Sequence, residues 1–385
     1  MPGPSAIAPF TFATADQIVF GRGTATRAAQ VAAGYGRRVF LVHGAAGRGA
    51  AGLAGDLAAL GVTTCTFSCG REPDLDMVEA ALALARGEQA DCVVSLGGGS
   101  VIDLGKAVAA LLFNPGPALD YLEIVGKGLP LQADPAPFVA LPTTAGTGAE
   151  ATRNAVINIP AHRRKVSLRD IRMLPDVAII DPALTDNTPR AVTLASGLDA
   201  VTQVIEPYVC ARANPLTDAL CRDAIPRGLK ALARLATGEC KEARDNLSAV
   251  SLAGGMALAN AGLGAVHGLA GVIGGFAPDA PHGAICGTLL PHVLAANAAV
   301  APAGSITAQR LDEVQAQIVA CLGLESADGF AAWIRDQGLP TLAALGLRAE
   351  DHDAVAAAAQ KSSSMAANPV DLSVETLKAI LKATA

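Results

Sequence analysis

Short apolar runs alternate with helical stretches through the first half of the chain. The runs predict five strands, at Arg38–His43, Thr63–Ser68, Asp91–Leu96, Phe138–Leu141 and Val177–Asp181. Helical stretches lie between the earlier runs, at Gly49–Leu60, Leu75–Arg86 and Val101–Leu112. This alternation favours a mostly parallel sheet covered by helices. Two further segments, Ala155–Ile159 and Lys165–Leu168, flank a polar turn and predict an antiparallel hairpin appended to the sheet.

The second half of the chain has a different pattern. From about Thr193 onward helical periodicity dominates, and we expect no strand there. Helices are predicted at Ala200–Cys210, Pro215–Leu235, Ala243–Ala261, Thr307–Leu322, Ser326–Gln337, Glu350–Ala359 and Val374–Ala383. Pro226 should kink or split the second of these. The chain is therefore expected to form an α/β domain over residues 1–190 and an all-helical domain over residues 191–385.

Composition narrows the class of protein. The 385 residues are 51% apolar with a net charge of −6, and no basic patch stands out, so nucleic acid is excluded as a partner. Eight scattered cysteines without a CxxC pair indicate reduced thiols in a cytoplasmic protein. The N-terminus lacks a signal-peptide pattern, and the apolar stretch Ala249–Ile273 is Gly-rich and contains His267. We interpret that stretch as buried helices and expect no membrane association.

A glycine-rich turn gives the sharpest local signal. Gly97, Gly98, Gly99 and Ser100 directly follow a predicted strand and precede a predicted helix. Glycines let a ligand approach the backbone, and the free amides and dipole of a helix N-terminus favour an anion. The motif is not GxGxxG, and taken alone it could also be a turn that packs the helix on the sheet.

A second polar loop follows another predicted strand. It contains Thr143, Thr144 and Thr147 with two glycines, and a surface turn with threonine caps would look similar. Ligands of open parallel sheets lie beyond the carboxyl ends of the strands, so the two loops together predict a nucleotide-binding edge and a Rossmann-like domain. After the first predicted strand, Gly44 and Arg48 occur where NAD-selective proteins often carry an acidic residue, so we expect NADPH to be accepted.

Asp199, His267 and His282 are candidate metal ligands in the helical half. Gln203 follows Asp199 by four residues, so the two should share one helix face. One Asp, two His and a further oxygen donor would suit a divalent ion. The spacing alone is not diagnostic, and the histidines could equally be satisfied core residues.

Jointly these motifs resemble the iron-containing (group III) alcohol dehydrogenase family, which includes the maleylacetate reductases and has a fold similar to dehydroquinate synthase. The resemblance covers nearly the whole chain. It rests on six segments: GGGSVIDLGKA at Gly97, PTTAGTGAEAT at Pro142, Lys165 with its K-x-S segment, LPDVAIIDPALT at Leu174, SGLDAVTQVIE at Ser196, and the HGLAG, PHG and LLPHV motifs of His267–Val293.

The resemblance implies a role for each matching residue. Gly98, Gly99 and Ser100 would hold the pyrophosphate of NAD or NADP, and Gly44 and Gly97, each at the end of a predicted strand, are further cofactor-binding candidates. Thr143 and Thr144 would contact the nicotinamide side, and Thr147 belongs to the same loop. Lys165 would reach the ribose, whereas Asp103 matches a family position whose role could be structural. The family's metal ligands map to Asp199, Gln203, His267 and His282, with Fe(II) or Zn(II) as the ion.

Three departures from the family pattern concern the metal. Gln203 stands where iron-dependent members have His, and a carboxamide oxygen is a weaker donor than imidazole. Gly271 replaces a second histidine often found four residues after His267, and the gap from His267 to His282 is one residue longer than usual. Because maleylacetate reductases work without a metal, a metal-free enzyme is a second reading.

The resulting hypothesis is an NAD(P)-dependent oxidoreductase that interconverts a small alcohol and its aldehyde or ketone. A metal would act as Lewis acid, or His267 or His282 would act as general acid without one. A metal-independent maleylacetate reductase, a dehydroquinate synthase-like lyase and a non-catalytic nucleotide-binding protein remain alternatives. A homodimer or higher homo-oligomer is expected from the resemblance.

Overall fold

The computed structural model describes residues 7–384, which divide into two compact units. The α/β unit comprises Thr14–Thr188, and the helical unit comprises residues 189–384 together with residues 7–13. The sequence placed the division at residue 190 and assigned residues 7–13 to the first domain. In the structure those residues belong to the helical unit, because the side chain of Asn260 both accepts from the amide of Ala13 at 2.7 Å and donates to its carbonyl at 2.8 Å.

Six parallel strands form the sheet of the α/β unit, in the order β1-β8-β5-β4-β2-β3. They are β1 (Gln17–Phe20), β2 (Arg38–Gly44), β3 (Thr63–Cys69), β4 (Cys92–Gly97), β5 (Phe138–Pro142) and β8 (Val177–Ile180). The five predicted strands are thus confirmed, and β1 was missed because it is a four-residue edge strand. The predicted hairpin is also present, as β6 (Asn154–Ile159) and β7 (Arg164–Arg169).

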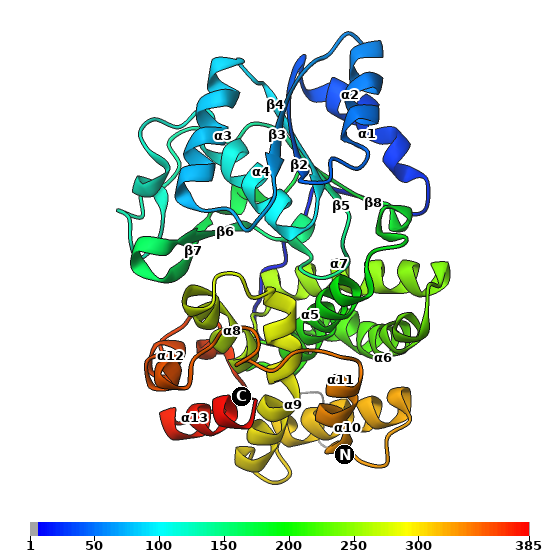
Figure 1. Cartoon of the computed structure of the whole chain (residues 1–385), viewed down its shortest axis with the longest axis vertical. Coiled ribbons are helices and arrows are strands. Elements are labelled where there is room, and N and C mark those ends of the chain that lie inside the picture. Colours follow the sequence, from blue (N-terminus) through cyan, green and yellow to red (C-terminus); the bar gives the residue numbers. More distant parts are fainter. Residues whose placement is uncertain (1–6, 385) are drawn as a thin grey trace. The chain divides into compact units, whose positions relative to one another are not determined.

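Helices cover both faces of the sheet (Figure 1). One face packs against α3 (Leu75–Gly87) and α4 (Gly99–Leu111), and the other packs against α1 (Ala28–Tyr35) and α2 (Ala50–Ala59). Successive residues of one strand alternate between the two cores: Phe40 and Val42 of β2 face the first core, and Val39 and Leu41 face the second. The central strand β4 is buried along its full length, as a parallel strand covered on both sides should be.

The described part of the helical unit contains helices and short turns and no strand. Its helices are α5 (Arg190–Val209), α6 (Pro215–Thr237), α7 (Lys241–Asn260), α8 (Ala265–Phe276), α9 (His282–Val300), α10 (Ile306–Leu322), α11 (Gly329–Asp336), α12 (His352–Ala359) and α13 (Val374–Ala383). The seven predicted helices are present. No separate bounds were predicted for α8 and α9. α5 begins ten residues before its predicted start. The expected split at Pro226 is wrong, since α6 continues through it.

One helix of the described chain, α9, is long and apolar enough to cross a membrane by length and composition. α7 and α8 satisfy the same criterion only as a pair, with a bend of 95° between them. Half of the apolar window of α9 is buried inside the structure, as in the core helix of a globular protein. The pattern is therefore weak evidence for a membrane span.

Close packing of α4 on the sheet depends on Gly105. A Cβ at this position would lie 1.9 Å from Oγ of Ser95 in β4 and 2.9 Å from the ring of Phe138 in β5. Ser95 cannot simply turn away, because its hydroxyl donates to the carbonyl of Val101 at 3.0 Å. Gly105 thus sets the distance between the helix and the strands that precede both polar loops.

Gly105→Ala should lower the free energy of unfolding by roughly 1–3 kcal/mol, because overpacking outweighs the better helix propensity of alanine. Urea unfolding measures the change. The matched control is Gly52→Ala in α2, where a Cβ meets nothing within 4 Å; it should stabilise by about 0.5–1 kcal/mol. Combining Gly105→Ala with Ser95→Ala should recover part of the loss, and equal effects at positions 105 and 52 would contradict this account.

Candidate functional site

The predicted cofactor residues lie at the carboxyl ends of three adjacent strands. Gly44 ends β2, Gly97 ends β4, and the threonine loop follows β5. The chain also changes direction across the sheet here, since β3 lies beyond β2 on one side and β5 lies beyond β4 on the other. Ligands of doubly wound sheets bind at such a switch point.

The N-terminus of α4 is open. Gly98 is its N-cap residue in extended conformation, and no side chain caps this end. The first amides of a helix have no acceptor inside it, so those of Gly99 and Ser100 are available to an anion. Gly98, Gly99 and Ser100 are all partly exposed, whereas the strand before them is buried.

The two polar loops are packed against each other. A Cβ on Gly98 would lie 3.1 Å from Oγ1 of Thr144, and one on Gly99 would lie 2.7 Å from Oγ1 of Thr147. Thr143 is joined to the same strand end, because its amide donates to the carbonyl of Gly97 at 2.9 Å. Any residue larger than glycine would therefore fill the space between the helix N-terminus and the threonine hydroxyls. This cradle of amides and hydroxyls fits the diphosphate of a dinucleotide.

A buried lysine holds the threonine loop in place. Lys106 of α4 is 1% exposed, and its Nζ donates to the carbonyls of Ala149, Thr152 and Asn154 at 2.6–3.0 Å and contacts Oγ1 of Thr152 at 2.7 Å. Burial lowers the pKa of Lys106 to about 8, although the charges of Asp103 and Glu150 act in the opposite direction. Lys106 therefore acts as a structural tether.

Glu150 is the acidic residue of the same loop and is 2% exposed. Burial raises its pKa to about 7, opposed by a hydrogen bond to its own backbone and by the charge of Lys106. The loop that would contact the nicotinamide side is thus held by a buried cation and a buried acid, whose proton affinities shift in opposite directions from their ordinary values.

Two other predicted cofactor residues make protein contacts. Lys165 of β7 is partly buried, with a side chain that is 6% exposed, and it forms an ion pair with Glu72, which follows β3. Asp103 accepts from the amide of Val156 in β6 at 3.2 Å and lies 4.0 Å from Nζ of Lys106. These contacts connect α4 and the hairpin to the sheet, and the roles of both residues toward a cofactor stay predictions.

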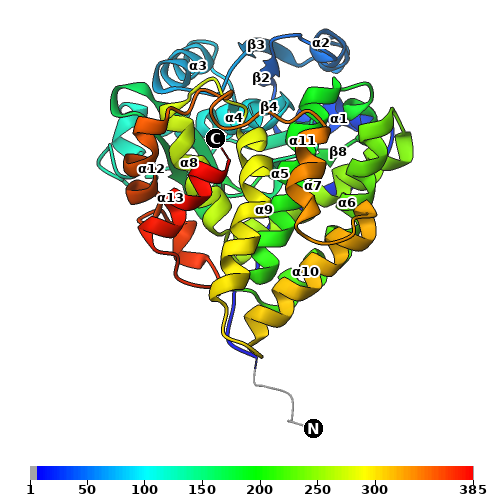
Figure 2. The same cartoon turned by 60° about the horizontal axis from the view of Figure 1, so that its bottom comes forward.

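In the helical unit, three of the four predicted metal ligands lie together. Asp199 comes from α5, His267 from α8 and His282 from the first turn of α9. Cys286, one turn further along α9, completes the cluster, and one donor atom from each of the four residues lies within 4.8 Å of every other. Figure 2 shows α9 beside α5, and the two helices contact each other.

Glu206 orients the ring of His267. This buried carboxylate accepts from Nδ1 of His267 at 2.6 Å and from the amide of Val266 at 2.7 Å. With a proton on Nδ1, Nε2 points to Oδ1 of Asp199 at 3.4 Å. Both atoms are acceptors when the ring is neutral, so a proton or a cation must lie between them.

The proton affinities of the cluster reflect this arrangement. Burial alone would lower the pKa of His267, but its interactions with Cys286, Asp199 and Glu206 raise it well above its ordinary value. Burial would likewise raise the pKa of Asp199, yet His267 and the charge of His282 lower it. The two shifts have one cause, which is that the imidazoles and the carboxylates face each other in a buried space.

Gln203 occupies the position one turn after Asp199 on α5 and is 3% exposed. A Cβ on Gly254 of α7 would lie 3.1 Å from Cβ of Gln203, so the two helices pack closely at this residue. Its role as a ligand stays a prediction. Gly271, four residues after His267, has open space at its Cβ position.

The sequence interpretation missed two residues of this site. Cys286 was grouped with the buried thiols, although its spacing of four from His282 would place both on one helix face. Glu206 lies seven residues after Asp199, which also returns to the same face of α5. Neither spacing signals a site until α8 and α9 are known to be helices that pack on α5.

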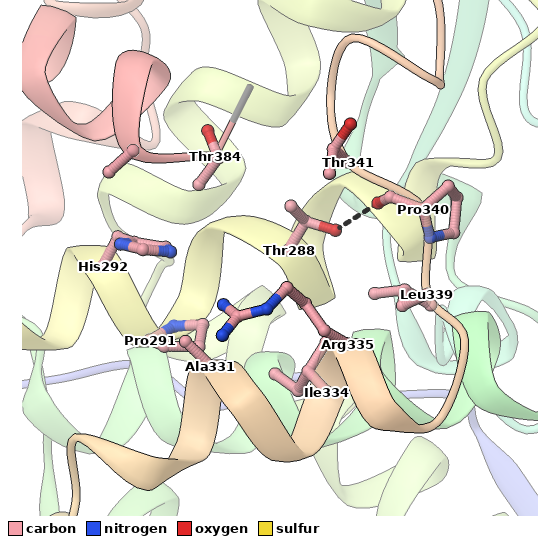
Figure 3. Close-up of a pocket in the computed structure, with 11 residues that line it drawn as sticks. Thr288, Pro291, His292, Ala331, Ile334, Arg335, Leu339, Pro340, Thr341 and Thr384 are labelled. Carbon is pink, nitrogen blue, oxygen red and sulfur yellow. Dashed lines mark hydrogen bonds between the residues drawn. The ribbon is translucent and has the colours of Figure 1, made fainter.

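Another pocket of the helical unit lies between α9, α11 and the end of α13 (Figure 3). Its volume is about 420 Å³ including the part open to solvent, and it is lined by Thr288, Pro291, His292, Ala331, Ile334, Arg335, Leu339, Pro340, Thr341, Ala383 and Thr384. Burial and the charge of Arg335 lower the pKa of His292. No predicted site residue lines this pocket, so it is separate from the donor cluster.

Two family models match the chain. The model described as iron-containing alcohol dehydrogenase covers residues 15–182, and the C-terminal model of the Fe-containing alcohol dehydrogenase family covers residues 193–385. The two matched regions correspond closely to the α/β unit and the helical unit.

Individual relatives agree with these matches. Alcohol dehydrogenase 4 of Schizosaccharomyces pombe is 36% identical over 80% of this chain and 72% of its own length. A crystal structure of 1,3-propanediol oxidoreductase superimposes with a TM-score of 0.86, at 29% identity, over 98% of this chain and all of the other. The NADH-dependent butanol dehydrogenase A of Thermotoga maritima gives 0.83 at 25% identity, over 98% and 99% of the two chains.

Glu150 should make stability depend on pH. Its pKa rises from 4.5 to about 7 on folding, so the folded state binds the proton more tightly than the unfolded state does. The contribution is fully present below about pH 4.5 and is lost as the pH rises through about 7. Glu150→Gln should therefore flatten the fall in urea midpoint across this window, with exposed Glu88→Gln as control. A slope equal to that of the parent protein would show that Glu150 does not bind the proton.

Proposed function

This chain belongs to the iron-containing alcohol dehydrogenase family, and we propose that it reduces small aliphatic aldehydes to alcohols, and the reverse, with a nicotinamide dinucleotide. The general activity follows from the family: the protein is an oxidoreductase that interconverts an alcohol and an aldehyde or ketone. The substrate class is supported by the names of similar proteins, which specify 1,3-propanediol and butanol. The observation that carries the proposal is the carboxylate–histidine cluster of Asp199, His267 and His282, of which the first two are buried.

The α/β unit would bind the cofactor, which supplies the hydride when bound. The amides of Gly99 and Ser100 hold the pyrophosphate at the N-terminus of α4, and Gly98 leaves room beside Thr144. Lys106 fixes the threonine loop that borders this space. These roles rest on the fit of the cradle to a diphosphate.

The helical unit would hold a divalent ion, which supplies Lewis-acid stabilisation of the negative charge on the substrate oxygen. Asp199, His267 and His282 are the residues that would bind the ion. Two facing acceptors, Nε2 of His267 and Oδ1 of Asp199, fit a cation between them. Glu206 keeps the imidazole in the tautomer that presents Nε2. If no ion is required, His267 is the group that holds the proton for the alcohol oxygen.

We also propose a cytoplasmic location and a homodimer or larger homo-oligomer. Free thiols support the location, because all eight cysteines are unpaired. The resemblance to the family is the support for the oligomer, and sedimentation would measure it.

Gly44 should determine the choice of dinucleotide. It ends β2, an added Cβ meets nothing within 4 Å, and Arg48 follows it without an ion pair among residues 7–384. We expect NADPH to be accepted, because the 2′-phosphate meets no carboxylate there. Gly44→Asp should raise the KM for NADPH at least tenfold, or about 1.4 kcal/mol, and leave that for NADH within a few-fold. Gly52→Asp adds the same charge elsewhere; equal effects of the two would refute the assignment.

His267→Ala should reduce kcat/KM for butanal by at least about a hundredfold, because it removes a group that binds the ion or the proton. The assay follows loss of nicotinamide absorbance with a panel of aldehydes and maleylacetate, before and after chelation. His292→Ala, in the separate pocket, is the control. Unchanged turnover in His267→Ala would remove this residue from the site, and full activity after chelation would favour the metal-free maleylacetate reductase.

A further inference from the structure

Cys286 is a buried thiol that lies inside the donor cluster of the helical unit. It lies one turn after His282 on the same face of α9, and it is completely buried. Its Sγ is 3.5 Å from Nε2 of His282. The donor cluster of the helical unit therefore includes one sulfur, and α9 contributes two of its four donors.

Two glycines bring this face of α9 against α5. A Cβ on Gly283 would lie 2.2 Å from the carbonyl oxygen of Ala195 and 3.0 Å from Cβ of Asp199. A Cβ on Gly287 would lie 2.6 Å from Cδ1 of Leu198. Because the two glycines flank Cys286, the backbones approach closely where the thiol and the carboxylate meet.

Asp199 is the second observation that indicates a ligand. It is 2% exposed, and its Oδ1 is buried without a hydrogen-bond partner in the described chain. A buried carboxylate oxygen without a partner is costly unless a cation or proton reaches it. The oxygen lies in the four-donor cluster, 3.4 Å from Nε2 of His267.

The distances suit a tetrahedral ion. Donors bonded at about 2.0–2.3 Å with tetrahedral angles lie about 3.3–3.8 Å apart. The His267–Asp199 and His282–Cys286 separations, 3.4 and 3.5 Å, fall in this range, and no donor pair exceeds 4.8 Å. Small side-chain adjustments would close the set around one ion.

We propose that Cys286 supplies the fourth donor of this site, in place of the histidine that is absent at position 203. The set of one carboxylate, two imidazoles and one thiolate favours zinc, which accepts sulfur, nitrogen and oxygen ligands in tetrahedral geometry. Gln203, whose neutral carboxamide is a weaker donor, then has a packing role beside Gly254. The catalytic use of the ion rests on the proposed function. The identity of the four donor residues does not depend on it.

Metal binding by Cys286 requires loss of the thiol proton. The S–H bond breaks, its proton goes to solvent, and the sulfur electron pair forms the bond to the divalent ion. No oxidant or reductant is needed. Iron(II) and zinc(II) would undergo the same exchange.

Cobalt(II) titration of the metal-stripped full-length chain tests the proposal without turnover. A thiolate ligand gives a near-ultraviolet sulfur-to-cobalt charge-transfer band, and tetrahedral geometry gives intense visible bands. We expect one Co²⁺ per chain with both features, displaced by an equivalent of Zn²⁺. Cys286→Ser should lose the charge-transfer band and weaken Zn²⁺ at least tenfold, and Cys286→Ala should do the same if serine disturbs folding.

The comparison variants make the result specific. Cys221→Ser alters another fully buried thiol of the helical unit and should keep the band. Gln203→Ala should also keep it. The proposal is overturned if Cys286→Ser retains the band, if Gln203→Ala loses both band and metal, or if the parent chain binds no Co²⁺ in the micromolar range. If the parent chain shows the charge-transfer band but does not reduce aldehydes, the proposed function is refuted and the proposed donor set is retained.

Discussion

The pairing of the Glu206 carboxylate with His267 is the interaction on which the helical unit's chemistry depends. Glu206 accepts at the amide of Val266 and at the imidazole of His267, so one buried anion fixes both the start of α8 and the tautomer of its histidine. Gly264 makes this possible, because a Cβ there would lie 2.8 Å from Oε1 of Glu206. Without this contact Nε2 of His267 would have no defined direction toward Asp199.

The two units use the same property of helix N-termini in opposite ways. In the helical unit the first turn of α8 is satisfied by the chain's own carboxylate, so its dipole contributes to internal order. In the α/β unit no side chain caps α4, and glycines keep the space in front of it open. One end is therefore closed by an internal anion, and the other is available to an external one.

Most of the α/β unit could be predicted from the sequence, because its strands and loops are marked by residues that are neighbours along the chain. β-branched or apolar runs predicted the strands, and GGGS and the threonine loop were placed correctly after strands, which prove to be neighbours in the sheet. The missed elements lack such local signals. β1 is a short edge strand, and α8 and α9 lie in a stretch so rich in glycine and alanine that apolar periodicity is weak.

The candidate site was predicted in part for the same reason. Asp199, His267 and His282 could be matched to a motif, but the proximity of Cys286 depends on two glycines that let α9 contact α5, which is a tertiary effect. Likewise, the tether from Lys106 to the carbonyls of Ala149, Thr152 and Asn154 cannot be seen from spacing, because these acceptors are main-chain atoms. Sequence patterns identify side chains that can bind a metal, but they do not show which of these side chains lie close together in the folded chain.

The position of residues 7–13 has a consequence for synthesis. Asn260 holds this segment in the helical unit, which is therefore built from two separate stretches of the chain. The α/β unit is inserted between these two stretches. Residues 14–188 leave the ribosome as a continuous whole and can fold first. Ala13 therefore has to wait for its hydrogen-bond partner until α7, which carries Asn260, has been translated after the whole α/β unit.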